Sequence, residues 1–266
     1  MASRFETPAK TYRISEILTH QLSLWVDTTV ASSIGAPVGL EDIRAAVERV
    51  RGSNAVVLNP GQAEQLAGKF GGAHRPGLVV RLDWTNVFRG KRHPTPCQEP
   101  VYCLIAQPDE ALALGASAVM ATLLAGFDEA FEADNVREVA RFARQATRDN
   151  IPLAIDVRPL GPRVSDENRA DTILLGASMA LELGADILVI PYPGRDALHT
   201  AVSFVSVPIV VDIDAVARDD RKGVVRALSP AEIRGVLLRE KLFASGAIEA
   251  EIQGIRTIQT DSVEGV

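Results

Sequence analysis

Acidic side chains recur at the ends of short apolar runs in this sequence. Asp27, Asp83 and Asp212 each stand directly after such a run. Asp156 lies inside another run, two residues before Arg158. If folding brings these carboxylates together, they must be neutralised by a bound cation, by paired arginines or by raised pKa values. The pattern therefore indicates one of three kinds of site: a metal site, a proton-transfer site or a cluster of ion pairs.

Each kind of site predicts a different chemistry for the same residues. In the first, Asp27, Asp156 and Asp212 hold Mg²⁺ or Mn²⁺, which prefer oxygen ligands, and the metal polarises a carbonyl group and stabilises an enolate. In the second, the carboxylates bind hydroxyl or amino groups of a substrate and transfer protons. In the third, the aspartates cap loops or pair with arginines such as Arg158, and their role is structural. The residues by themselves leave all three open.

The elements that would position these residues are short apolar runs that alternate with helical patterns. The predicted strands cover residues 24–26, 55–58, 77–82, 118–122, 153–157, 187–190, 207–211 and 248–252. Their continuous apolar character is typical of parallel strands covered by helices. Eight such units close naturally into a barrel, so the sequence predicts an α/β fold, a single (β/α)8 TIM barrel over residues 1–266. An open, doubly wound sheet is the alternative, but no glycine-rich dinucleotide motif follows the first strand.

Two helices near the ends of the chain complete the predicted fold. A short helix is expected at about residues 12–20, before the first strand. The segment 229–232, Ser-Pro-Ala-Glu, matches a capping box with proline at the first helical position. A helix is therefore expected from residue 229 to about residue 244, followed by the eighth strand.

The carboxyl ends of barrel strands meet at one mouth, where barrel enzymes place their active sites. We therefore expect the four aspartates to lie there together. Asn59 ends the second predicted strand and could join them. The other candidates follow the fifth, sixth and seventh strands, and they are Arg158, Tyr192 and Lys222.

Composition narrows the classes of partner. The chain has 266 residues, a net charge of −6 and no basic stripe, so it lacks the electrostatic pattern of a nucleic-acid-binding protein. Its longest apolar runs are far too short to span a bilayer, and the N-terminus shows no apolar segment of a secretory signal. The two cysteines form neither a disulfide framework nor a zinc-ligand pattern. We therefore expect a cytoplasmic protein that acts on a small molecule and binds neither nucleic acid nor membrane.

Several segments carry a family resemblance. The most specific is Glu-Leu-Gly-Ala-Asp-Ile at residues 182–187, and weaker matches lie at residues 12–18, 109–119 and 208–211. In order and spacing these segments resemble the class I aldolases of the DhnA/DeoC type, the fructose-bisphosphate and autoinducer-2 aldolase-like proteins. The resemblance covers about residues 12–257. It implies a TIM barrel, a carbon–carbon lyase activity on sugar-type substrates and a homo-oligomer.

The positions that carry the chemistry depart from this resemblance. The family forms a Schiff base on a lysine, and the matching position holds Val189, which cannot form an iminium. The family's tryptophan and tyrosine on the fifth strand match Asp156 and Arg158. Its glycine pair after the seventh strand, whose backbone N–H groups would cradle a phosphate, matches Asp212 and Ile213. A phosphorylated substrate is therefore less expected than the family implies.

The first functional hypothesis is a divergent aldolase-family lyase, or an isomerase, that acts on a small hydroxy-carbonyl compound without a Schiff base at position 189. Asp27 and Tyr192 are retained in the resemblance, so Asp27 would be the acid and base while Tyr192 assists proton transfer. Asp156 would act with them at the catalytic centre. The residues assigned to substrate binding are Arg158, Asp83, Asp212, Asn59 and Lys222.

Two alternatives accompany this hypothesis. A Schiff base could have moved to a loop lysine, Lys222 or Lys91. The second functional hypothesis is a non-catalytic homologue that binds a metabolite or scaffolds a homo-oligomer, because a fold never determines function by itself.

Overall fold

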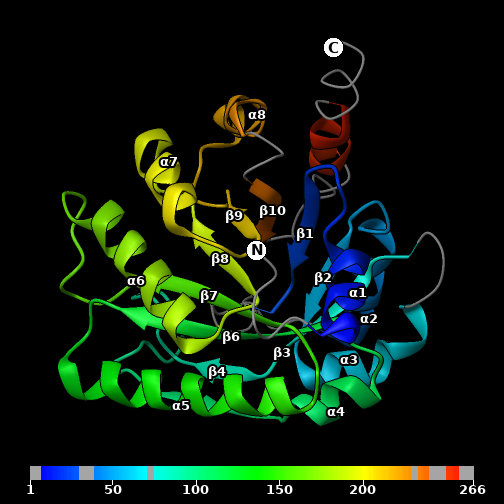
Figure 1. Ribbon diagram of the computed structural model, residues 1–266, viewed down its shortest axis with the longest axis horizontal. Helices are drawn as coiled ribbons and strands as arrows, with labels where there is room; N and C mark the ends of the chain where they lie inside the picture. Colours follow the sequence, from blue (N-terminus) through cyan, green and yellow to red (C-terminus); the bar gives the residue numbers. More distant parts are fainter. Residues whose placement is uncertain (1–6, 30–38, 71–74, 229–232, 240–249, 258–266) are drawn as a thin grey trace.

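The computed structural model describes residues 7–29, 39–70, 75–228, 233–239 and 250–257 (Figure 1). Eight parallel strands form a closed barrel in the order β1-β10-β9-β8-β7-β6-β3-β2. Their bounds are β1 (Ser23–Asp27), β2 (Ala55–Leu58), β3 (Gly77–Arg81), β6 (Ala118–Ala125), β7 (Leu153–Pro159), β8 (Ile187–Pro191), β9 (Ile209–Asp212) and β10 (Ile233–Arg239). The predicted TIM barrel is confirmed, and closure of the sheet excludes the open, doubly wound alternative.

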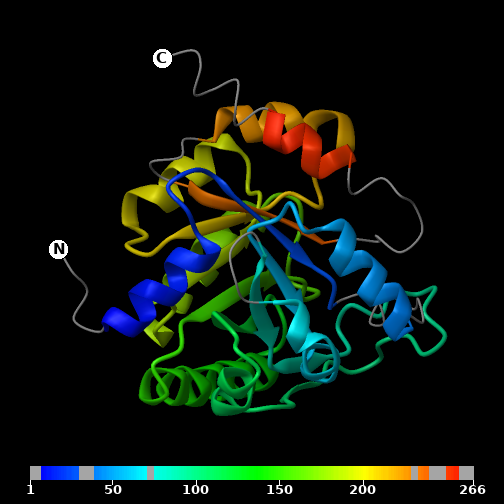
Figure 2. The same cartoon turned by 90° about the vertical axis from the view of Figure 1, so that its right-hand side faces the viewer.

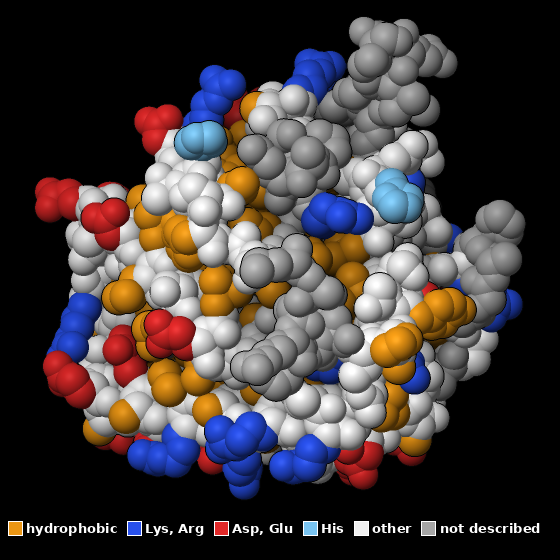
Figure 3. Space-filling view, in the orientation of Figure 1, with side chains coloured by type: hydrophobic (Ala, Val, Ile, Leu, Met, Phe, Trp, Pro, Cys, Tyr) orange, Lys and Arg blue, Asp and Glu red, His pale blue; other side chains and the backbone are white. Residues whose placement is uncertain are grey.

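Helices surround the strands, as Figures 1 and 2 show from two directions. They are α1 (Pro8–Ile17), α2 (Leu40–Arg49), α3 (Pro60–Leu66), α4 (Pro108–Ala113), α5 (Glu129–Arg148), α6 (Arg169–Leu183), α7 (Arg195–Phe204) and α8 (Arg218–Ala227), with a 3-10 turn at Ala67–Lys69. The longest helix, α5, buries an apolar stripe that includes Val139 and Phe142. Lys and Arg side chains gather on the lower edge of the face in Figure 3, where α5 lies. Within the described residues, no helix has the length and apolar character needed to cross a membrane.

The amino end of the barrel is closed by α1. This helix begins at Pro8, earlier than predicted, because the Thr7 side chain accepts a hydrogen bond from the Lys10 backbone and Pro8 suits the first turn. Ile17 and the following Leu18 join the apolar interior of the barrel. The Trp25 indole donates to the Ile17 carbonyl at 2.9 Å. The functional end must therefore be the opposite, carboxyl end.

The last barrel strand lies where a helix was predicted. Residues 233–239 form β10, whereas the capping-box segment 229–232 lies outside the described residues. β10 pairs with β1 through Leu237 and Trp25, and with β9 through Leu237 and Asp212. The strand predicted at 248–252 is also wrong over residues 250–252, because residues 250–257 are helical, with Ile252 and Ile255 buried on one face, whereas 248 and 249 lie outside the described residues. A capping signal is local, and the pairing that closes the barrel overrides it.

Interior positions of five strands change from apolar to charged over two residues. Nearer the amino end the interior holds Trp25, Val79, Ala154, Val210 and Leu237. Two residues further along the same strands stand Asp27, Arg81, Asp156, Asp212 and Arg239, all buried. Side chains two apart on a strand share a face, so these charged groups point into the barrel at its carboxyl end.

A hairpin extends from β3 beside this end of the barrel. Its strands β4 (Asp83–Thr85) and β5 (Tyr102–Leu104) pair antiparallel. Leu82 donates its backbone N–H to Met120 of β6, and Ile105 donates to Leu82, so the base of the hairpin is anchored to the barrel wall. The Asn86 side chain bridges the loop by bonding to Glu99 and Val101.

Candidate active site

Three aspartates and three arginines form one buried cluster at the carboxyl end of the barrel. We call this set, which consists of Asp27, Asp156, Asp212, Arg81, Arg158 and Arg239, the Asp–Arg network. The Arg81 Nη2 atom lies 2.9 Å from carboxylate oxygens of both Asp27 and Asp156. Arg239 contacts all three aspartates at 2.6 to 2.7 Å. Arg158 joins Asp156 at 2.7 Å to Asp212 at 2.6 Å.

The network holds Asp27 and Asp156 in the ionised form. Burial opposes ionisation of Asp156, but the guanidinium groups of Arg158, Arg239 and Arg81 outweigh it and hold the pKa of Asp156 well below its ordinary value. Burial also opposes ionisation of Asp27, and the Arg81 and Arg239 charges again lower its pKa. These two aspartates are therefore poor proton carriers near neutral pH.

Acidification is expected to destabilise the protein through Asp27 and Asp156. Their folded pKa values lie below the value of about 3.9 for an unfolded aspartate. The stability that they contribute is fully present above the unfolded pKa and is lost as pH falls through the folded pKa. The free energy of unfolding, measured by urea denaturation, should decrease as pH drops below about 4. Equal stability at about pH 5 and about pH 2 would contradict this expectation.

The metal alternative does not fit the donor set. The oxygens of Asp27, Asp156 and Asp212 that face one another are already bound by guanidinium groups, which occupy the positions where a cation would sit. Among the described residues, no group of three or more His, Cys, Asp or Glu side chains could hold a metal ion. Mg²⁺ or Mn²⁺ held by these three aspartates therefore does not fit this arrangement, in which paired arginines neutralise the acidic mouth.

Val189 lies fully buried in the apolar interior, directly beside the network. It pairs in register with Asp156 on β7 and with Val210 on β9. No lysine of the described chain belongs to this interior. Lys10 binds Asp186 near the amino end, and Lys91 lies exposed in the loop that joins the hairpin strands.

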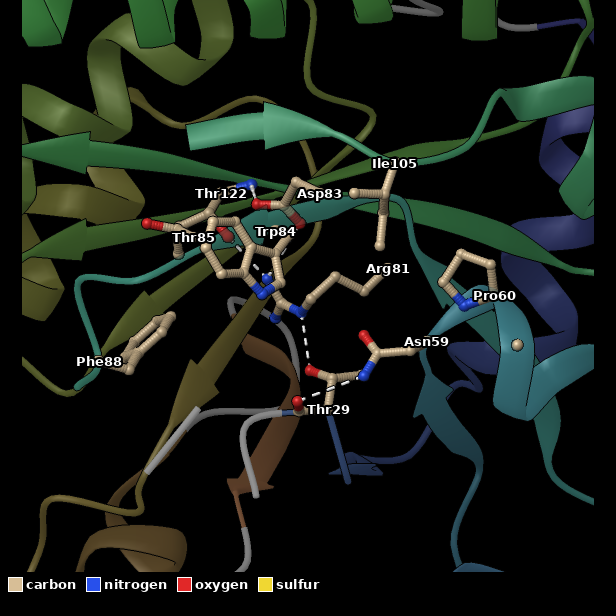
Figure 4. Close-up of a pocket in the computed structure, with 11 residues that line it drawn as sticks. Thr29, Asn59, Pro60, Arg81, Asp83, Trp84, Thr85, Phe88, Ile105 and Thr122 are labelled. Carbon is tan, nitrogen blue, oxygen red and sulfur yellow. Dashed lines mark hydrogen bonds and ion pairs between the residues drawn. The ribbon is translucent and has the colours of Figure 1, made fainter. Parts of the chain in front are cut away.

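A pocket of about 350 Å³ opens beside the network, between the barrel and the hairpin. We call it the mouth pocket. Its lining comes from the segments after β1 and β2, from β3 and β6, and from the hairpin with its flanking residues. It consists of Thr29, Asn59, Pro60, Gly61, Arg81, Asp83, Trp84, Thr85, Phe88, Ile105 and Thr122. Figure 4 shows Asp83 and Thr122 on one side of the Arg81 guanidinium and Thr29 and Asn59 on the other. The pocket thus combines a polar floor with apolar walls, as small-molecule sites do.

Arg81 connects the pocket to the Asp–Arg network. Its Nε atom donates to the Thr29 hydroxyl at 2.8 Å, and its Nη1 atom donates to the Thr122 hydroxyl at 2.7 Å. Its Nη2 atom is held by Asp27 and Asp156. The network therefore positions a fixed positive charge at the floor of the mouth pocket.

The structure brings together most of the predicted site residues. Asp27, Asp156, Asp212 and Arg158 meet in the network. Asp83 and Asn59 line the mouth pocket, as Figure 4 shows.

Two predicted site residues lie elsewhere. Tyr192 packs against the hydrophobic cluster between the barrel and its helices. Lys222, on α8, lies beside Gly254 and lines a separate surface pocket with Glu251.

Sequence reasoning missed four polar residues of this region. Arg81 lies inside the predicted strand 77–82 and Thr122 ends the predicted strand 118–122, but neither is a carboxylate, so the acidic pattern did not point to them. Counting two residues back from Asp83 along its strand would have found Arg81. Arg239 was assigned to a helix, so its position at a strand end was hidden. Thr29 belongs to the loop after β1, and nothing in its spacing pointed to the pocket.

Comparisons with known proteins identify the family. The profile described as DeoC/LacD family aldolase matches residues 22–223, and the chain belongs to this family. A class 1 fructose-bisphosphate aldolase of Thermoproteus tenax is 34% identical over 147 residues, covering 55% of this chain and 50% of that protein. A 2-amino-3,7-dideoxy-D-threo-hept-6-ulosonate synthase of Halobacterium salinarum is 27% identical over 205 residues, covering 76% of this chain and 72% of that protein. The match thus spans about half the length of the Thermoproteus relative.

A solved structure shows the same architecture. An archaeal fructose 1,6-bisphosphate aldolase superposes with a TM-score of 0.74 at 22% identity, covering 94% of this chain and 98% of that chain. At this identity the likeness supports the barrel fold. Together with the family match, it confirms the resemblance expected from the sequence.

Proposed function

We propose that this protein is a carbon–carbon lyase that cleaves or forms an aldol bond in a small, sugar-type hydroxy-carbonyl compound bound in the mouth pocket. The observation that carries the proposal is the polar floor of this pocket, at the carboxyl ends of the strands of an aldolase-family barrel. The names of the relatives, a fructose-bisphosphate aldolase and a hept-6-ulosonate synthase, favour the same class of substrate.

The chemistry proposed for the pocket rests on charge stabilisation. Aldol cleavage places negative charge on the carbonyl oxygen of the fragment that becomes an enolate. Arg81 is a fixed cation at the pocket floor and would stabilise that charge. In this proposal Asp27 and Asp156 act through Arg81, because they hold its guanidinium in place. Thr122 accepts a hydrogen bond from Arg81 and can donate its hydroxyl proton to a substrate oxygen.

The proposed reaction uses no Schiff base. Val189 offers no amine, and its neighbours in the barrel interior, such as Ala154 and Val210, are apolar. Among the lysines that the structure describes, none lines the mouth pocket. We therefore propose a mechanism of proton transfer with enolate stabilisation by Arg81.

A cleavage assay with a trapping step tests this proposal. The protein is incubated with a panel of ketose and hydroxy-keto acid substrates, phosphorylated and unphosphorylated, and released aldehyde is followed by NMR. We expect turnover of at least one compound, with no change in protein mass after borohydride treatment in its presence. A borohydride-stable adduct on a lysine would overturn the lysine-free mechanism. Absence of cleavage across the panel would overturn the lyase.

The Asp–Arg network favours a second candidate, the non-catalytic homologue. Its six side chains form ion pairs with one another and fill the barrel beside Val189, where the family would hold a reactive lysine. A protein of this kind would bind a panel compound, detected by calorimetry, without cleaving it. Binding without turnover would select this candidate over the lyase.

A further inference from the structure

Asp83 differs from the other aspartates at the carboxyl end of the barrel. Each aspartate of the Asp–Arg network contacts at least two arginines. Asp83 has a single arginine nearby, and its Oδ1 atom lies 3.5 Å from Arg81 Nη1, which is beyond a good hydrogen bond. This carboxylate is therefore only partly neutralised.

The two oxygens of Asp83 have different surroundings. Oδ2 accepts a hydrogen bond from the Thr122 backbone N–H at 2.9 Å. Oδ1 is buried, on a side chain that is only 1% exposed, and it has no hydrogen-bond partner among the described residues. A buried oxygen without a partner is costly unless a ligand, a water molecule or a proton satisfies it. Since Asp83 lines the mouth pocket, a bound substrate is one group that can reach Oδ1.

The pKa of Asp83 is shifted upwards, whereas the pKa values of Asp27 and Asp156 are shifted downwards. Burial raises the pKa of Asp83, and the single nearby guanidinium of Arg81 offsets only part of this effect. The other titratable groups that face it are Asp156 on β7, which raises its pKa further, and Tyr102 and Cys103 on β5. Burial also raises the pKa of Tyr102, so the phenol stays protonated. Two carboxylates whose surroundings push their proton affinities apart are typical of a site with separate acid–base and electrostatic roles.

Backbone hydrogen bonds hold Asp83 in place. Its backbone pairs with Leu104 across the hairpin, and the preceding residue, Leu82, is bonded to Met120 of the barrel. The Thr122 backbone N–H binds Oδ2 and leaves Oδ1 near Arg81 Nη1, at 3.5 Å, beside the mouth pocket that Asp83 lines. A rigid carboxylate with one free oxygen can take a proton from a bound group without reorganisation.

We propose that Asp83 is the catalytic acid and base of the mouth pocket, and that its Oδ1 atom exchanges a proton with the hydroxyl group of a hydroxy-carbonyl substrate. This inference rests on the proposed function. In the cleavage direction the hydroxyl proton moves to Oδ1 and the carbon–carbon bond breaks, which releases an aldehyde. The electron pair of that bond forms an enolate beside Arg81. Asp83 then returns the proton to the enolate carbon, so atoms and electrons balance without an oxidant or a reductant.

The substitution Asp83→Asn tests this role. The amide keeps an oxygen to accept from Thr122 but cannot carry the proton, so we expect kcat to fall by roughly 100- to 10,000-fold with little change in KM. The limb of the wild-type pH profile that reports Asp83 should disappear, and Asp83→Glu should restore part of the activity. Asp134→Asn, on the exposed face of α5, is the matched control and should leave kcat unchanged. Calorimetry with the same substrate checks that the Asp83→Asn protein still binds it.

The outcomes separate this inference from the proposed function. Wild-type turnover with an unchanged rate in Asp83→Asn would overturn the role of Asp83 and leave the lyase standing. Loss of substrate binding together with rate in Asp83→Asn would show a binding residue and overturn the acid–base role. No turnover by the wild type would overturn the proposed function and the role of Asp83 with it.

Discussion

Replacing Asp156 by alanine is expected to lower the free energy of unfolding by about 3–5 kcal/mol. Asp156 contacts Arg81, Arg158 and Arg239, and its side chain is fully buried. Without it, three buried guanidinium groups share only Asp27, Asp212 and the more distant Asp83. An arginine cannot relieve the excess charge by losing a proton, because its guanidinium group stays charged at every pH at which the protein folds. Urea or thermal denaturation measures the loss.

The pH dependence of this loss is a further test. The arginines stay charged at every pH at which the protein folds, so the deficit of Asp156→Ala should persist at about pH 5. Asp134→Ala removes an exposed ion pair with Arg137 and is the control, which should show no measurable loss. If Asp156→Ala is as stable as this control, the network contributes nothing to folding.

The substitution Arg239→Met is expected to cost a similar amount at neutral pH, about 3–5 kcal/mol, for the opposite electrostatic reason. Arg239 contacts Asp27, Asp156 and Asp212 at once, and methionine keeps much of its volume without the charge. Removal of this cation leaves buried carboxylates with too little positive charge. Their folded pKa values should then rise above their wild-type values.

The loss in Arg239→Met should shrink as the pH falls, because carboxylates can take up protons. A folded protein with higher carboxylate pKa values binds more protons as the pH falls, so the variant gains stability relative to the wild type. The difference in unfolding free energy between wild type and Arg239→Met should therefore be smaller at about pH 5 than at about pH 7. The exposed Arg137→Met is the matched control. A deficit that is independent of pH would contradict this account of the network.

The difference in pH dependence between the two variants follows from one physical property. Arginine keeps its charge at every pH at which the protein folds, whereas aspartate can be neutralised. The pair of measurements therefore tests whether the charges of the network, rather than the volume of its side chains, hold this end of the barrel together.

Most of the barrel could be predicted from local pattern. The first seven strands are continuous apolar runs separated by helical segments, and each run is long enough to show its character without reference to its neighbours. β10 is the exception. Its residues 233–239 follow a helix-start signal, and their strand conformation comes from pairing with β1 and β9, which lie far away in the sequence.

The candidate site was also predicted from the sequence only in part. Strand-end position sufficed to select Asp27, Asp83, Asp156 and Asp212, because a parallel barrel brings all carboxyl ends to one mouth. Strand-end position does not show which of these aspartates is paired with arginines. Arg239 and Asp27 are 212 positions apart in the chain, and no local pattern reports that they touch.

Residue types and their spacing predicted an aldolase-type barrel with an acidic mouth, and the family resemblance implied a lysine at the position of Val189. Only the tertiary structure showed that arginines neutralise most of the aspartates at this mouth. Closure of β10 against β1 and β9 delivers Arg239 to three of the aspartates, and β3 delivers Arg81. Asp83, on the hairpin beyond β3, keeps one oxygen free. The physical reason is that proton affinity depends on the charges and burial around a group, and both come from segments distant in the sequence.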